Sequence, residues 1–337
     1  MAETREVRVE ADGARLAGTL ALSGQPEPQP GIILLHGSGW GERRFYEAFV
    51  ELFTRAGIAT LTFDRRGSGE STGDPAMDIE RWAGDAVTVY DVLREQPEID
   101  ATRTALWGYS NGAWVATLAA SKAPDLAALV LTGTSAVSPA RAETYRRVED
   151  LRARGIGEAT LEAIREAWTL IFECTAEGLW DEERKRSLES ARAVIESDRD
   201  LARLPVPNFV QANPRLSSIP LFDQPPLNSD LAPAAGTLPG MAFEPLPCFA
   251  AIRCPVLVVL AEDDANAAPR ESLELYRRVA AARTPGTFDV ALLEGSPHTF
   301  TRKPRADDEL GRVLGLEEFR PDYLDTMSSW LQTHLQA

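Results

Sequence analysis

Short apolar runs alternate with helical patterns along most of the chain. The runs lie at residues 31–36, 58–63, 103–107, 127–132, 255–260 and 287–293. Apolar residues at helical spacing lie between most of them, at 43–56, 78–95, 111–122 and 270–283. Strands that alternate with helices in this way are typical of a mostly parallel, twisted sheet with helices on both faces. The pattern therefore predicts an α/β fold.

The two ends of the chain carry different patterns. Strand candidates at 7–10 and 14–22 flank Asp12-Gly13, which is a strong hairpin signal. We therefore expect an antiparallel pair before the parallel sheet. Near the other end, apolar spacing predicts an amphipathic helix that packs on the body and carries His334; its apolar positions are Tyr323, Met327, Trp330, Leu331 and Leu335.

The alternation stops between residues 138 and 247, which predicts an insertion after the sixth parallel-type strand. Its first part, 141–203, has apolar residues at near-helical spacing, whereas 204–247 holds ten prolines and few charges. We expect a helical plus Pro-rich cap or lid at 138–247, and a main domain formed by 1–137 and 248–337. The alternative for the Pro-rich part is a long surface loop that packs on the body.

A serine lies between glycines at a predicted strand-to-helix turn. The sequence Gly-Tyr-Ser-Asn-Gly occupies residues 108–112, directly after an apolar run and before a helical pattern. A turn this sharp leaves little room for side chains at Gly108 and Gly112, and it exposes the Ser110 hydroxyl. It also brings the Asn111 N–H toward any oxyanion formed on an attacked carbonyl. This is the layout of a nucleophile elbow, although the motif alone is weak evidence.

A serine nucleophile needs a base within hydrogen-bond reach, and the chain holds three histidines. His36 ends a predicted strand inside a Gly-rich turn, so we interpret it as part of the architecture. His334 lies in the C-terminal helical pattern, which favours a surface or half-buried helix position. By elimination the candidate base is His298, which follows the strand candidate at 287–293 on a predicted loop.

The base in turn needs a carboxylate that orients it. The apolar strand candidate 255–260 leads directly into Ala261-Glu262-Asp263-Asp264, so three carboxylates lie at one strand end. Period-two alternation points Glu262 and Asp264 to the same side while the strand lasts. The chain order of the three candidate groups is serine, acid, histidine, which is the order expected of an α/β hydrolase.

Five segments together resemble the α/β-hydrolase superfamily: 35–39 (LHGSG), 63–71 (FDRRGSGES), 107–112, 261–264 and 295–300. The resemblance covers most of the chain and implies the α/β-hydrolase fold. It favours Asp264 over Asp263 as the acid, although Ala261 departs from the more usual glycine. It also implies that Ser38 or Gly39 supplies a second oxyanion N–H beside that of Asn111. The nearest branches are capped esterases and the dienelactone-hydrolase-like and prolyl-oligopeptidase-like members.

Other chemistries fit the sequence less well. The Gly-rich loop after residue 36 lacks a following Gly-Lys-Ser/Thr, and no G-x-G-x-x-G is complete, which disfavours a phosphate cradle. Three scattered histidines without H-E-x-x-H spacing give no candidate metal site. Arg65 and Arg66 could bind a substrate carboxylate. A structural role, through Asp64 or neighbouring carbonyls, is the favoured interpretation.

The amino-acid composition limits the classes of binding partner that we expect. The formal net charge is −16 over 337 residues, which disfavours nucleic acid and anionic membrane surfaces. Cys174, Cys248 and Cys254 form no C-x-x-C, which fits reduced thiols. The start lacks the apolar region of a signal peptide, and no run approaches a membrane span. We therefore expect a cytoplasmic protein that acts on a small molecule, with its oligomeric state open.

The resemblance and the candidate triad together predict a serine hydrolase that needs no cofactor. We expect an acyl-enzyme on Ser110, with a hydrophobic carboxylic ester as the first substrate class. Thioesters, lactones and small peptides or amides are alternatives on the same triad, because fold and triad do not fix specificity. The alternative from another class is a non-catalytic protein that keeps this fold to bind a small apolar ligand.

Overall fold

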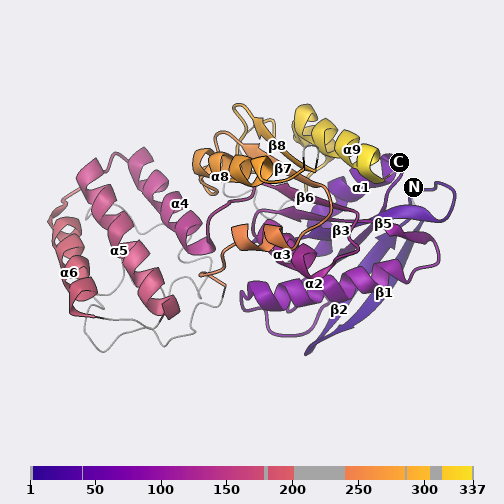
Figure 1. The fold of residues 1–337 in the computed structure, drawn as a ribbon, viewed down its shortest axis with the longest axis horizontal. Helices are drawn as coiled ribbons and strands as arrows, with labels where there is room; N and C mark the ends of the chain where they lie inside the picture. Colours follow the sequence, from indigo (N-terminus) through magenta and orange to yellow (C-terminus); the bar gives the residue numbers. More distant parts are fainter. Residues whose placement is uncertain are drawn as a thin grey trace. The chain divides into compact units, whose positions relative to one another are not determined.

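The computed structural model describes residues 3–39, 41–177, 181–200, 240–284, 287–303 and 313–335. In this part of the chain eight strands form one sheet, in the order β1-β2-β4-β3-β5-β6-β7-β8 (Figure 1). The strands are β1 Thr4–Ala11, β2 Ala14–Ala21, β3 Gln29–Leu35, β4 Ala59–Phe63, β5 Ile99–Tyr109, β6 Ala128–Thr132, β7 Val256–Ala261 and β8 Phe288–Leu293.

Strands β3 to β8 pair in parallel, whereas β1 and β2 pair antiparallel with each other and β2 pairs antiparallel with β4. The hairpin predicted at Asp12-Gly13 is confirmed, because Ala11 pairs with Ala14 and Gly13 has a φ of +67°. The α/β fold class is likewise confirmed. Each predicted apolar run became a strand because parallel strands are covered by helices on both faces.

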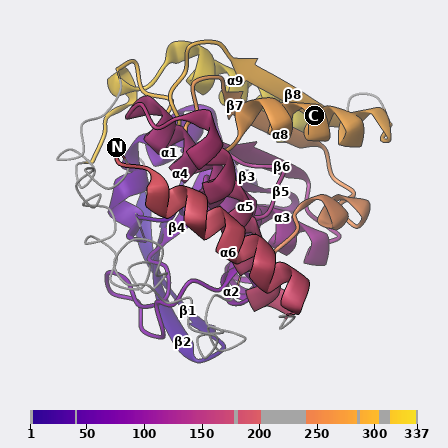
Figure 2. The same ribbon diagram turned by 90° about the vertical axis from the view of Figure 1, so that its left-hand side faces the viewer.

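The chain divides into two compact units. Unit 1 comprises Met1–Ser138 and Phe243–Ala337, and unit 2 is Pro139–Ala242. Unit 2 contains α4 (Pro139–Ala153), α5 (Glu158–Glu177) and α6 (Glu182–Ser197), with α5 packed against both of its neighbours (Figure 2). The helices expected within 141–203 are thus present in the described range. Residues 204–239, most of the Pro-rich part expected at 204–247, lie outside the described residues, and the role of the insertion as a cap stays a prediction.

The insertion follows β6, which is the sixth strand of the chain but the fourth that pairs in parallel. The sequence-based count of six parallel-type strands is therefore corrected. The reason is physical: β1 and β2 are joined by a two-residue turn, which can connect antiparallel strands only.

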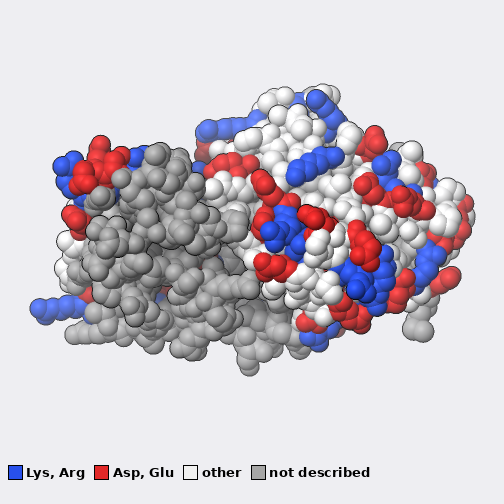
Figure 3. Space-filling model, turned by 90° about the horizontal axis from the view of Figure 1, so that it is seen from below, with Lys and Arg blue, Asp and Glu red and all other residues white. Residues whose placement is uncertain are grey.

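Acidic and basic side chains are mixed on the described part of the face in Figure 3. Charged side chains also pair elsewhere in the described residues, for example Arg5 with Glu98 at 3.0 Å and Arg43 with Glu6 at 3.2 Å. Exposed pairs of this kind each contribute about 0–1 kcal/mol of stability. None of the described helices combines the length and the apolar character that a membrane span requires.

Two hydrophobic cores flank the sheet of unit 1. Alternate residues of β3 enter different cores, with Ile33 on one face and Ile32 on the other. The first core packs against α2 (Ile79–Arg94), α3 (Asn111–Lys122) and α8 (Pro269–Ala281), and the second against α1 (Glu47–Arg55) and α9 (Pro321–Leu335). The described part of this unit also contains the short 3₁₀ helices η1 (Arg43–Tyr46), η3 (Leu246–Ala250) and η5 (Leu316–Glu318).

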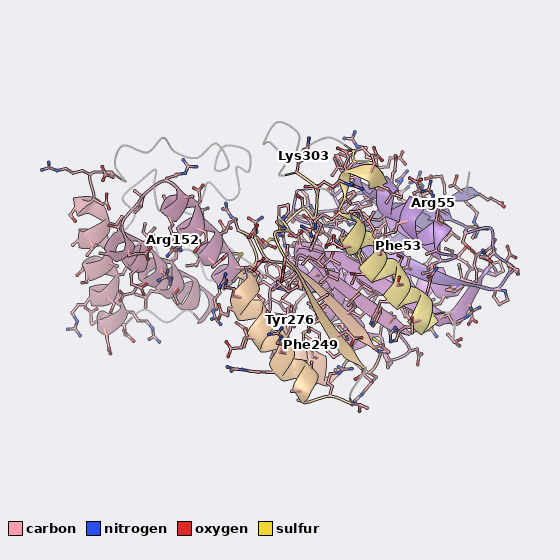
Figure 4. All side chains as sticks on the ribbon, turned by 90° about the horizontal axis from the view of Figure 1, so that it is seen from above. Phe53, Arg55, Arg152, Phe249, Tyr276 and Lys303 are labelled. Atoms are coloured by element: carbon pink, nitrogen blue, oxygen red, sulfur yellow. The ribbon has the colours of Figure 1, made fainter. Side chains whose placement is uncertain are left out.

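Aromatic side chains fix both cores. On α1, Phe53 is fully buried whereas Arg55 is exposed, and both are labelled in Figure 4. On the other face, Phe249 and Tyr276 meet edge to face with ring centroids 5.9 Å apart (Figure 4). These packed helices and the sheet support the loops at the carboxyl ends of the parallel strands. Ligand-binding and catalytic sites of such sheets lie at these carboxyl ends.

A buried ion pair joins the loop after β4 to α2. The Arg66 Nε donates to Asp85 Oδ2 at 2.6 Å, and a terminal nitrogen of Arg66 donates to the Asp12 carbonyl at 3.0 Å. Both side chains of the pair are only 3% exposed. The hydrogen bond to Asp85 raises the pKa of the Arg66 guanidinium.

Removing one partner of this pair should destabilise unit 1 strongly. Arg66→Met leaves the Asp85 carboxylate buried without its counter-charge, so we expect a loss of about 3–5 kcal/mol in the free energy of unfolding. The double variant Arg66→Met/Asp85→Leu should lose less of the free energy of unfolding than the single variant, because it leaves no uncompensated buried charge. Urea unfolding of both proteins measures this; a single-variant loss below about 1 kcal/mol would contradict the assignment.

Candidate active site

The backbone at Ser110 has the strained geometry of an elbow. Strand β5 ends at Tyr109 and helix α3 begins at Asn111, and Ser110 between them has φ 54° and ψ −121°. A positive φ is uncommon for a residue other than glycine and persists only where the surroundings enforce it. Here the Ser110 N–H donates to the Thr132 carbonyl at 2.9 Å, which ties the elbow to β6.

The two glycines of the motif allow the backbone to fold this tightly. A Cβ at Gly112 would overlap the carbonyl oxygens of Leu35 and His36, and one at Gly108 would overlap the carbonyl of Gly112. Helix α3 therefore starts in direct contact with the end of β3. No side chain larger than hydrogen fits at either position without a shift of the backbone.

The structure brings the three predicted triad residues together. The Ser110 hydroxyl lies 3.0 Å from His298 Nε2, and His298 Nδ1 lies 2.7 Å from Asp264 Oδ2. A carboxylate can only accept, so Nδ1 carries the imidazole proton and Nε2 is left to accept from the serine. The residues come from three loops, which follow β5, β7 and β8 at the same edge of the sheet.

Asp264 is held from two sides. Its Oδ1 accepts from the backbone N–H groups of Asn266 at 2.7 Å and Ala267 at 3.1 Å, which leaves Oδ2 for His298. The Asp264 side chain is 1% exposed and the His298 side chain 17%. Asp263, by contrast, is exposed. Of the two aspartates weighed from the sequence, Asp264 is thus the one in contact with the histidine.

Glu262 fixes the histidine loop instead of the histidine. Its Oε2 accepts from the Gly295 N–H at 3.0 Å, and the Asp263 N–H donates to the Ser296 carbonyl at 3.0 Å. Strand β7 ends at Ala261, so the strand alternation considered for Glu262 and Asp264 does not extend to them. Both side chains contact the loop that follows β8. The contact of Glu262 was not predicted from the sequence.

Sequence reasoning also missed two residues that pack against the imidazole. The Tyr109 hydroxyl donates to the His298 carbonyl at 3.3 Å. Gly133 has a φ of +55°, and a Cβ there would lie 3.3 Å from His298 Cε1 and 3.2 Å from the Tyr109 ring. A glycine directly after a buried strand, at the same sheet edge as the elbow, is the sequence signal that could have drawn attention to Gly133.

The predicted oxyanion donors lie on two segments next to Ser110. Asn111 is the first residue of α3, so its backbone N–H has no acceptor within the helix. Ser38 and Gly39 follow β3 on a loop that approaches the elbow, since a Cβ at Gly37 would lie 3.5 Å from Ser110 Cβ. The Gly37 N–H itself is engaged, because it donates to the Tyr46 hydroxyl at 2.8 Å. The choice between Ser38 and Gly39 stays open.

The other two histidines lie away from the triad. The ring of His36 is buried edge to face against Tyr46 and Phe63, with centroids 5.1 and 4.9 Å apart. Burial lowers the pKa of His36 to about 3. His334 is half-buried on α9 and stacks on Trp330. Neither histidine is therefore placed to serve Ser110.

The residue types that could bind a metal ion do not cluster in the described part of the chain. Within the described residues, no group of three or more His, Cys, Asp or Glu side chains could hold a metal ion. Cys248 is half-buried and Cys254 is buried, and both are free thiols. The side chain of Cys174 lies outside the described residues. Burial raises the pKa of both described thiols, that of Cys254 to about 12.

The comparisons with known proteins show similarity to part of the chain. Residues 26–164, less than half of the chain, match the model of a family described as serine aminopeptidase, S33. Thiohydrolase aneE of Aspergillus aculeatus is 33% identical over 102 residues, which cover 30% of this chain and 31% of that protein. The quorum-quenching protein AidA of Acinetobacter baumannii is 34% identical over 103 residues, which cover 30% of this chain and 34% of that protein. The matches thus span about a third of the length of these relatives.

The likeness in structure extends over nearly the whole chain. An esterase of Pyrococcus furiosus superposes with a TM-score of 0.56 at 14% identity, covering 99% of this chain and 93% of that one. At this identity the likeness concerns the fold. The sheet order, the strand-to-helix elbow and this structural match show that the chain has the α/β-hydrolase fold.

Glycine replacement tests the tight packing of the elbow. Gly112→Ala forces a Cβ into the carbonyls at the end of β3, so we expect a loss of about 1–3 kcal/mol in stability. The matched control is Gly84→Ala in α2, where nothing lies within 4 Å and alanine is the better helix former. Urea unfolding should show the first variant destabilised and the second unchanged or more stable. Equal effects would contradict the close approach of α3 to β3.

Proposed function

We propose that the protein is a serine hydrolase that cleaves a carboxylic ester through an acyl-enzyme on Ser110. The observation that carries the proposal is the pair of hydrogen bonds that links Ser110 Oγ through the His298 imidazole to Asp264. A serine hydroxyl is a poor nucleophile near neutral pH, and an oriented imidazole within hydrogen-bond reach is what activates it.

The mechanism follows from this geometry. His298 Nε2 accepts the Ser110 proton while Oγ attacks the substrate carbonyl. The oxyanion then accepts hydrogen bonds from the Asn111 N–H and from that of Ser38 or Gly39, each donor contributing about 3 kcal/mol of transition-state stabilisation. The imidazolium gives its proton to the leaving oxygen, and a water activated by the same imidazole cleaves the acyl-enzyme.

Asp264 acts through the histidine. Its buried carboxylate accepts from Nδ1–H, which fixes the tautomer that leaves Nε2 unprotonated, and it stabilises the imidazolium as it forms. The two backbone hydrogen bonds to its other oxygen hold the carboxylate in place. No step of this scheme requires a cofactor.

An ester is the preferred substrate because an alkoxide leaves more easily than an amine. The likeness in fold to the Pyrococcus esterase is compatible with this choice. A thioester is the second candidate, and the relative named a thiohydrolase favours it. We further propose that the substrate is a small molecule. Ranking esters, thioesters, lactones and aminoacyl amides by kcat/KM would order the candidates.

The nucleophile is tested by labelling. The wild-type protein should hydrolyse a short-chain nitrophenyl ester and react with a fluorophosphonate at Ser110, because phosphonylation needs the same activated hydroxyl. Ser110→Ala should lose both reactions. Peptide mass spectrometry locates the label. A wild-type protein that is neither labelled nor active would favour the non-catalytic binding protein, and persistent labelling in Ser110→Ala would move the nucleophile elsewhere.

The acid is tested by a matched pair of aspartates. Asp264→Asn should lower kcat by about 10⁴-fold, since the amide favours the wrong imidazole tautomer. Asp263→Asn alters the neighbouring residue, which is exposed and does not contact His298, so its kcat should stay near that of the wild type. Steady-state kinetics on the same ester compares them. The reverse ranking would reassign the role to Asp263.

A further inference from the structure

Three buried side-chain nitrogens around the oxyanion loop, residues 37–39, have no partner among the described residues. They are His36 Nε2, Arg65 Nε and Trp82 Nε1. They come from three elements: the end of β3, the loop after β4, and α2. A buried polar atom without a partner costs free energy, so such a cluster calls for an explanation.

The three side chains line one small cavity. The space within it that the centre of a water molecule can occupy is about 10 Å³. That space matches roughly one water molecule. Because the walls contribute several polar atoms, the cavity meets the second condition for holding water, which is two to four hydrogen-bond partners.

The hydrogen-bonding capacities of the three nitrogens are complementary to one water. Arg65 Nε and Trp82 Nε1 each carry a proton and can only donate. Burial keeps His36 neutral by lowering its pKa to about 3, and its ring already bonds to the Phe63 backbone. The free Nε2 is therefore an acceptor. A water that accepts twice and donates to His36 satisfies all three nitrogens.

The terminal nitrogens of Arg65 hold the oxyanion loop. Nη1 donates to the Gly37 carbonyl at 3.1 Å and Nη2 to the Ser38 carbonyl at 3.2 Å. Since a trans peptide points its C=O and N–H in opposite directions, the N–H groups of Ser38 and Gly39 point away from Arg65. These are the two candidate donors to the oxyanion. The guanidinium also stacks over the Trp82 ring at 4.2 Å, which limits its movement.

We propose that Arg65 is a positioning residue that presents the oxyanion N–H of the loop, and that one water in the cavity anchors it to His36 and Trp82. This inference rests on the proposed serine-hydrolase function. It also bears on the two roles that the sequence left for Arg65, because the bonds of both terminal nitrogens to backbone carbonyls are those expected of the structural role.

The effect of Arg65 should appear in kcat. Arg65→Met keeps much of the side-chain bulk but removes the donors to both carbonyls, and a displacement of about 1 Å in a catalytic group can cost 10²-fold. We expect kcat to fall by about 10²-fold with KM within about threefold of the wild-type value, because the loop donor acts on the oxyanion and not on the bound ester.

Arg43→Met is the matched control. Arg43 donates to Asp64 Oδ2 at 2.9 Å, so it stabilises the loop after β4 without contacting the oxyanion loop. Thermal midpoints should fall in both variants, but kcat only in Arg65→Met. In addition, guanidinium chloride should restore part of the activity of Arg65→Ala, whereas sodium chloride at equal ionic strength should not. A kcat of Arg65→Met within threefold of the wild type, or no rescue, would overturn the assignment.

The water is tested separately. A high-resolution crystal structure should place one water about 2.7–3.2 Å from the three nitrogens. Trp82→Phe keeps the ring beneath Arg65 and removes one donor, so kcat should fall less than in Arg65→Met. A cavity without water in that crystal structure would overturn the proposal that a water anchors Arg65. Fluorophosphonate labelling separates a failure of the proposed function from a failure of this inference. A wild-type protein that is not labelled would contradict both. A labelled wild type together with an Arg65→Met variant that reacts at the wild-type rate would contradict this inference alone.

Discussion

The contact between the first turn of α3 and the end of β3 is the constraint on which the site depends. Gly112 lies against the carbonyls of Leu35 and His36, and this closeness forces the chain to turn sharply at Ser110. The positive φ at that serine is strain, which the surrounding sheet compensates through the hydrogen bond to Thr132. One consequence is that the two segments proposed to bind the oxyanion, the start of α3 and the loop after β3, lie beside the same hydroxyl.

The electrostatic arrangement follows from burial. The Asp264 side chain is 1% exposed, and hydrogen bonds from two backbone N–H groups and one imidazole compensate its carboxylate for the loss of solvent. In a low-dielectric setting such fixed donors interact more strongly with a charge than water-exposed ones. The imidazole is partly exposed at 17%, which the proposed proton transfer to and from a substrate requires.

Periodicity and motif spacing predicted much of this molecule. The parallel strands, the hairpin at Asp12-Gly13 and the elbow at Ser110 each depend on local sequence, which is why they could be identified without coordinates. Three histidines could be narrowed to His298 because the other two lay in patterns with simpler explanations. The structure places His298 beside Ser110, although 188 residues separate them in the chain.

What the sequence could not supply depends on how loops fold against each other. Asp263 and Asp264 are indistinguishable by type, and only the turn made by Asn266 and Ala267 directs one of them inward. The strand order, in which β4 lies between β2 and β3, has no local signature either. Likewise the Glu262 side chain accepts from the Gly295 N–H, and the Gly133 backbone lies close to the His298 ring; no periodicity encodes either contact.

The loop after β4 links helix α2 to the loop after β3, because its two adjacent arginines have different partners. Arg66 enters a buried ion pair with Asp85 and fixes the loop to α2. Arg65 donates to the carbonyls of Gly37 and Ser38. Asp64 holds the base of the loop by accepting from the Arg43 and Glu70 backbone N–H groups. A loop fixed at these points can hold a neighbouring loop in one conformation, which is what an oxyanion site needs before the carbonyl is attacked.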